Sequence, residues 1–183
     1  MTNDVNLGIG LASGMAFTAP AGTALPTYPG EALAAGWKEI STVSDGGLTW
    51  TPNKDSEPIR NWAKITERLA SGDEGGLVKG EFLRTIASTL EAIFGEDNVE
   101  TTPATSEHGN LMKVKVEAGV SSTPKAFLFL MKDGDDMIML GTEVGMLRDL
   151  DDLAFVANDP IKYGFTIEAA AWTLLKDDGQ KAS

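Results

Sequence analysis

The pattern of apolar and polar positions predicts mainly β-strands. Between residues 111 and 117, apolar Met112, Val114 and Val116 alternate with charged side chains, and this period of two predicts a strand with one buried and one wet face. Residues 126–131 are continuously apolar, which is typical of a strand buried on both faces or shared with another chain. The Asp133-Gly134 pair that follows predicts a hairpin turn into a strand at 137–142.

Shorter apolar runs predict the remaining strands. Residues 37–44 and 48–52 are interpreted as a hairpin around Asp45-Gly46. Residues 64–70 and 77–84 are predicted as two strands, separated by a glycine-rich turn at 72–76. Further strands are expected at 144–148, 153–157 and 163–171. Residues 53–63 are predicted to form a polar loop, in which Ile59 and Trp62 need a burial site in the core or on a neighbouring subunit.

One stretch has helical periodicity. Its apolar side chains fall at i, i+4, i+7 and i+8, namely Ile86, Leu90, Ile93 and Phe94. Gly95 stands where a glycine ends many helices. Thr85 is the predicted N-cap, and Ser88 with Glu91 forms a capping box for a later start. We therefore expect one short helix that lies on a sheet.

The ends of the chain differ from its middle. Residues 1–36 contain six glycines and three prolines among alanine, serine and threonine, a composition that predicts an extended arm. Residues 37–175 are expected to form a single β domain, and residues 176–183 a polar tail that frays. With about eight to ten short strands and one helix, the fold class is mainly β (α+β), a β-sandwich or partly closed barrel with a flanking helix.

Composition narrows the function classes. The chain has 27 acidic and 15 basic residues, a net charge of −12, and this charge is spread along the sequence without a basic patch for phosphate. No cysteine is present, which excludes disulfides and fits assembly in a reducing compartment such as the bacterial cytoplasm. No run reaches the roughly 18 apolar residues of a membrane span, and the N-terminus lacks a secretory signal. We expect neither tight nucleic-acid binding nor a membrane partner.

No catalytic constellation emerges from the titratable residues. His108 stands between Ser106, Glu107 and Gly109, but adjacent loop residues rarely converge, whereas a triad brings together residues from separate elements. Two acidic clusters, Asp133 with Asp135 and Asp136, and Asp149 with Asp151 and Asp152, lack the order of an EF-hand loop. The glycines at 8, 10 and 14 miss the dinucleotide spacing. The interpretation is a protein that is not an enzyme and that holds no metal or cofactor.

Four segments together resemble a known family. They are residues 17–26 of the arm, residues 37–48, the acidic run 55–62 that ends in Trp62, and residues 82–95, followed by Glu96 and Asp97. Their order and spacing resemble the major tail proteins of long-tailed, non-contractile bacteriophages. The resemblance implies a structural virion protein whose hexameric rings stack into a tail tube, through which DNA passes during ejection without specific binding. It also implies assembly in the host cytoplasm and contacts with itself and with tail terminator, tape measure and distal tail proteins.

The resemblance also implies roles for individual residues. Contacts between rings are expected from the arm and from the loop at 53–62, with the candidates Leu7, Met15, Phe17, Pro20, Glu57, Ile59 and Trp62. Acidic residues on predicted strands are candidates for the lumen, where like charge repels the phosphate backbone: Glu67, Glu81 and Glu117.

Two alternatives remain open. A tube protein of a secretion or contractile injection system would share the fold, and the sequence separates it poorly from a phage tail protein. A monomeric carbohydrate-binding β-sandwich would fit the number of strands. It normally groups its aromatic side chains on one face, whereas the four tryptophans of this chain are scattered at 37, 50, 62 and 172.

Overall fold

The computed structural model describes residues 14–60, 66–116, 123–133, 136–155, 157 and 159–179, and it describes the side chains of all these residues except 54–60, 66–74 and 133. Strands make up 51% of the structure. The described part of the chain holds one α-helix. The predicted class, mainly β with one helix, is therefore confirmed. The sheet is not closed into a barrel, and the arrangement is consistent with a β-sandwich plus one helix.

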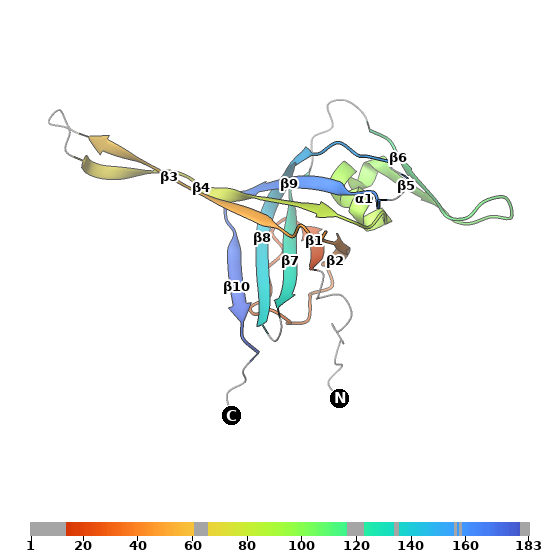
Figure 1. Cartoon of the computed structure of the whole chain (residues 1–183), viewed down its shortest axis with the longest axis horizontal. Coiled ribbons are helices and arrows are strands. Elements are labelled where there is room, and N and C mark those ends of the chain that lie inside the picture. Colours follow the sequence, from red (N-terminus) through yellow and green to blue (C-terminus); the bar gives the residue numbers. More distant parts are fainter. Residues whose placement is uncertain are drawn as a thin grey trace.

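Eight strands form one branched antiparallel sheet. They are β1 (Met15–Pro20), β2 (Lys38–Thr42), β3 (Thr49–Arg60), β4 (Thr66–Phe82), β7 (Lys125–Asp133), β8 (Asp136–Leu150), β9 (Tyr163–Ala169) and β10 (Thr173–Asp177), in the order β2-β1-β7-β8-β9-β4-β3, with β10 also paired to β8. Residues 137–141 of β8 pair with β10 and residues 145–150 pair with β9. In Figure 1, β7, β8 and β10 run down the view, whereas β3, β4 and β9 run across it.

The main core lies between the two parts of this bent sheet. Phe82 of β4, Phe165 of β9 and Phe129 of β7 are almost completely buried. The rings of Phe82 and Phe165 stack with their centroids 4.0 Å apart, and those of Phe129 and Phe165 lie 5.8 Å apart. Aromatic pairs at these distances stabilise the fold beyond the area that they bury.

Strand β7 is buried on both faces, as its continuous apolar run predicts. Phe127 and Phe129 face the main core, whereas Leu128 and Leu130 belong to a second cluster with Trp37. The two strands of the hairpin predicted around Asp133-Gly134 are confirmed, because β7 and β8 pair as far as Asp133 and Asp136; residues 134–135 lie outside the described residues. The strands predicted at 137–142 and 144–148 are a single strand, β8.

The predicted helix is present as α1 (Ala87–Phe94), with Leu90 and Ile93 buried in the main core. Gly95 ends it as predicted, at a φ of 90° that favours glycine, and its N–H donates to the Glu91 carbonyl. The predicted caps at the other end are wrong. Ile86 occupies the N-cap position without a side-chain hydrogen bond, and the Thr85 hydroxyl is instead hydrogen-bonded to the Tyr163 hydroxyl at 3.0 Å.

After α1, a short 3-10 helix, η2 (Glu96–Asn98), leads into a separate two-stranded sheet of β5 (Val99–Thr102) and β6 (Leu111–Val114). Strand β5 was not predicted, and β6 ends at Val114 and not at residue 117. The described residues of the strand predicted at 153–157 are not in a strand.

The predicted hairpin of residues 37–44 and 48–52 is wrong. Strand β2 pairs with β1, and β3 lies at the other end of the sheet order. Asp45 and Gly46 do form a turn, but the chain then crosses to the opposite end of the sheet, where β3 pairs with β4 and not with β2. An isolated bridge links Val43, just after β2, to Phe82 at the end of β4.

The predicted arm is shorter than residues 1–36. Residues 15–20 form β1, which lies between β2 and β7, and the side chains of Leu25 and Leu33 pack against the second core cluster. The strand Met15–Pro20 was not predicted, because the glycines and prolines around it are typical of an irregular segment. The C-terminal boundary predicted at residue 176 falls inside β10.

Candidate assembly surface

The most prominent feature outside the core is a long hairpin of β3 and β4. Its ladder runs from the Thr49–Lys79 pair to the Arg60–Thr66 pair, and it projects far beyond the body of the molecule (Figure 1). It replaces residues 53–60 of the loop predicted at 53–63 and the turn predicted at 72–76; residues 61–63 lie outside the described part. The strand predicted at 64–70 is confirmed for its described residues, 66–70, which belong to β4. Residues 53–60 and 72–76 show no apolar alternation that predicts a strand, because this part of the hairpin lies away from the body of the subunit.

The hairpin leaves the body at two glycines. Gly76 is the last residue of β4 that pairs with β9, opposite Ala169. A Cβ atom on Gly76 would lie 2.7 Å from the Thr51 carbonyl oxygen and 3.1 Å from the Pro52 Cα, and one on Gly75 would overlap the Ala169 carbonyl oxygen. The indole N–H of Trp172 donates to the Gly76 carbonyl at 3.0 Å. Close backbone contacts therefore fix the direction in which the hairpin departs.

A groove of 460 Å³ lies along this base. It is lined by residues 51–53 of β3, residues 75–77 of β4, residues 168–170 and Arg148. Arg148 and Glu168 face each other across a 3.5 Å ion pair that is more than half exposed on both sides, so the pair adds little to the stability of the subunit.

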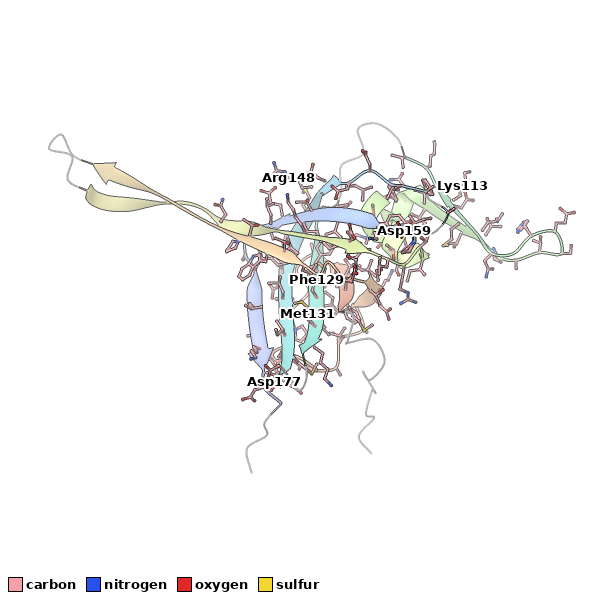
Figure 2. The ribbon with its side chains drawn as sticks, in the orientation of Figure 1. Lys113, Phe129, Met131, Arg148, Asp159 and Asp177 are labelled. Carbon is pink, nitrogen blue, oxygen red and sulfur yellow. The ribbon has the colours of Figure 1, made fainter. Side chains whose placement is uncertain are left out.

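The opposite end of the molecule carries exposed apolar side chains. Directly paired residues share a face of the β5–β6 sheet, and Val99 and Val114 of that sheet pack against the main core. Met112, on the same face, is 44% exposed, and Val116 beyond the end of β6 is 72% exposed. The prediction that Met112 and Val116 line a buried face of the subunit is therefore wrong, because the core covers this sheet only around Val114. Figure 2 shows Lys113 at this end and Arg148 toward the side from which the hairpin leaves.

The predicted ring-contact residues fall in different environments. Met15 is half-buried in β1, and Pro20 is exposed at its end. Phe17 is only 7% exposed and belongs to the second core cluster, so its side chain offers little surface for a contact between rings. Glu57 and Ile59 lie in the projecting part of β3, where side chains are outside the described part. Leu7 and Trp62 lie outside the described residues.

The three lumen candidates are not brought together by the described structure. Glu81 of β4 forms an ion pair with Lys162 at 3.7 Å. Glu67 lies in β4, but its side chain is outside the described part, as is the whole of Glu117. Their position relative to a channel stays a prediction.

The titratable residues form no evident reaction centre in the described residues. His108 is half-buried, and its Nδ1 lies 2.7 Å from the Gly109 carbonyl oxygen. Asp136 is paired with Lys176 at 2.6 Å. Within the described ranges, no group of three or more histidine, aspartate or glutamate side chains is placed to hold a metal ion, and no helix there is long and apolar enough to cross a membrane.

The family described as phage tail tube protein matches residues 1–178 of the 183. The chain belongs to this family. As a tail tube protein it is a structural component of a bacteriophage tail, and the family implies self-assembly into a tube and a place in the virion. Among curated proteins, none matches the chain.

Two surfaces of this tail tube protein were not predicted from its sequence. The first is the pair of open edges of the hairpin. These edges consist of backbone N–H and C=O groups, which the alternation of apolar and polar side chains does not reveal. The apolar residues of the β5–β6 end were recognised as apolar, but their exposure depends on how far the core extends beneath the sheet. Met112 and Val116, both exposed, are the side chains that a strand pattern alone assigns to the wrong environment.

Proposed function

We propose that this tail tube protein forms hexameric rings that stack into the tube of a non-contractile phage tail, through which DNA passes during ejection. Membership of the tail tube family and the projecting β3–β4 hairpin support this proposal. A hairpin of this length with no core of its own gains its stability from another chain, because an isolated two-stranded ribbon is only marginally stable in water.

The two ends of the molecule fit a head-to-tail contact. The hairpin projects from one end, and Met112 and Val116 are exposed at the other. A contact between two different surfaces of identical chains closes into a ring when the rotation between neighbours allows it. Burial of exposed apolar side chains in that contact would supply a hydrophobic contribution of about 25 cal/mol for each Å² removed from water.

The charge of the protein suits a passage for DNA. A net charge of −12 repels phosphate and disfavours sticking, which is consistent with a structural role without catalysis. In this proposal the partners are other copies of the chain, with tail terminator, tape measure and distal tail proteins at the tube ends, and assembly takes place in the host cytoplasm. The family match favours a phage tail over a secretion or injection tube.

The test is a concentration series of purified protein, examined by negative-stain electron microscopy and by sedimentation for mass. We expect rings or tubes of uniform width. The variant Val116→Glu should keep the thermal stability of the monomer but lose assembly, because that side chain is 72% exposed in the subunit. The matched control is Tyr28→Glu, which also places a carboxylate on an exposed apolar residue but lies outside the β5–β6 sheet; it should assemble normally. Assembly of Val116→Glu at wild-type concentrations would contradict the proposed role of this end.

A further inference from the structure

The projecting hairpin has two backbone edges, and prolines distinguish them. Pro52 pairs with Gly76 and Pro58 pairs with Leu69. In an antiparallel ladder, pairs that exchange both backbone hydrogen bonds alternate with pairs that exchange none. Proline has no N–H to give, so it is accommodated where its nitrogen faces away from the partner strand. Both prolines therefore belong to pairs whose backbone groups point outward.

A direct observation supports this assignment at the hairpin base. If the Pro52–Gly76 pair points outward, the backbone groups of Gly76 must face the far side of β4. On that side Gly76 pairs with Ala169 of β9, and its carbonyl accepts the indole N–H of Trp172. Trp172 thus occupies the last outward position that the body of the subunit covers.

The outward positions of the projecting part follow from the same register. On β3 they are Pro52, Lys54, Ser56 and Pro58, and on β4 they are Glu74, Ser71 and Leu69. The register shifts between Lys54 and Ser56, where one residue of β3 faces two of β4, so the positions on each side of this bulge are counted from the proline pair on that side. The outer edge of β3 has therefore lost two of its four N–H donors. The edge of β4 retains all three, and in the described residues it has no strand partner beyond Gly76.

We propose that the outer edge of β4, from Leu69 to Glu74, pairs with a strand of a second copy of this chain. That strand would lie on the same side of β4 as β9, beyond Gly76, where the pairing with β9 ends. This inference rests on the proposed self-assembly and adds which edge of the hairpin is used. An open strand edge with its donors intact recruits other chains, whereas proline blunts an edge. The β3 edge is therefore closed to pairing at Pro52 and Pro58, and ring neighbours meet the hairpin from one side only.

The first test is amide hydrogen exchange, resolved by NMR after the assembled protein is returned to monomer under quench conditions. In free monomer, the amides of Leu69, Ser71 and Glu74 should exchange rapidly. In rings or tubes we expect the exchange rates of these three amides to fall by about tenfold or more, and a tenfold fall corresponds to about 1.4 kcal/mol of protection. The amides of Lys54 and Ser56 should still exchange rapidly. Protection of Lys54 and Ser56 alone, or of neither set, would overturn the proposal.

Proline substitution provides a second, independent test. Leu69→Pro removes an outward N–H of β4 and no bond within the hairpin, so we expect the critical concentration for assembly to rise by about tenfold or more. Leu69→Ala retains the N–H and separates the backbone from the side-chain contribution. Ser56→Pro makes the same change on the β3 edge and should assemble at the wild-type concentration. Thermal unfolding of each monomer checks its fold.

The outcomes separate the two claims. Wild-type protein that forms no ring or tube would contradict the proposed function itself. Wild-type tubes with equal assembly of Leu69→Pro, or with loss of assembly in Ser56→Pro alone, would leave the proposed function intact and refute the choice of the β4 edge.

Discussion

Replacement of Gly76 by alanine tests how the hairpin is held at its base. Gly76 is buried between Pro52 of β3 and Ala169 of β9. An added Cβ atom would lie 2.7 Å from the Thr51 carbonyl oxygen, 3.1 Å from the Pro52 Cα and 3.1 Å from the Trp50 Nε1, where ordinary contacts begin at 3.4 Å. Two of these atoms belong to the backbone of the paired strand, so a rotamer change cannot relieve the overlap.

The magnitude follows from two opposing effects. Alanine reduces the entropy of the unfolded chain, which stabilises by about 0.4–1 kcal/mol, while overpacking of a tight site destabilises by about 1–3 kcal/mol. We expect a net loss of about 1–2 kcal/mol, which for a chain of this size lowers the Tm by roughly 2–8 °C. The hairpin should also leave the body in a changed direction, and assembly should weaken with it.

Thermal unfolding followed by circular dichroism measures this effect. The matched control is Gly109→Ala, because a Cβ atom there would meet nothing within 4 Å, and its Tm should equal or slightly exceed that of the wild type. A Gly76→Ala protein as stable as the wild type would show that these backbone contacts do not constrain the hairpin base.

Three further predictions concern the core, the hairpin anchor and one carboxylate. Phe165→Ala should lower the free energy of unfolding in urea by about 3–5 kcal/mol, because the ring is fully buried between Phe82 and Phe129; a loss below about 1 kcal/mol would contradict this. Trp172→Phe keeps an aromatic ring, although a smaller one, and removes the hydrogen bond to the Gly76 carbonyl, so the free energy of unfolding should fall by about 0.5–1.5 kcal/mol or slightly more, and unchanged stability would show that the bond contributes nothing. The N–H and hydroxyl of Thr27 donate to the Glu31 carboxylate and hold its pKa below the ordinary value of 4.5. Because the pKa is lowered, this contact stabilises the fold at neutral pH and is lost as the pH falls through the folded pKa; Thr27→Ala should raise the pKa in an NMR titration, and an unchanged midpoint would contradict the assignment.

The sequence predicts those elements whose environment lies within the subunit. Residues 126–131 form a strand buried on both faces, and the apolar stripe from Ile86 to Phe94 corresponds to α1, because local periodicity there matches burial. Strand β1 was missed because glycine and proline dominate the residues around its short apolar run. The partner of β2 was wrong because a turn at 45–46 does not determine which edge of a sheet the next strand joins.

The assembly surface was less predictable for a physical reason. The pattern of a strand arises from a core on one side of it, and the outer half of the β3–β4 hairpin has none in its own chain. The expected polar loop at 53–63 and the turn at 72–76 were reasonable interpretations of such residues. At Met112 and Val116 the alternation correctly indicates an apolar face. It does not indicate whether the same subunit buries that face, and here both side chains are exposed.

A cryo-electron microscopy reconstruction of the assembled protein would show directly how the subunits meet. We expect a tube of stacked six-membered rings, in which the β3–β4 hairpin of each subunit lies against a neighbouring copy. A tube in which the hairpin projects into solvent without contact would contradict the assembly role given to it, and an assembly that lacks a central channel would contradict the proposed passage of DNA.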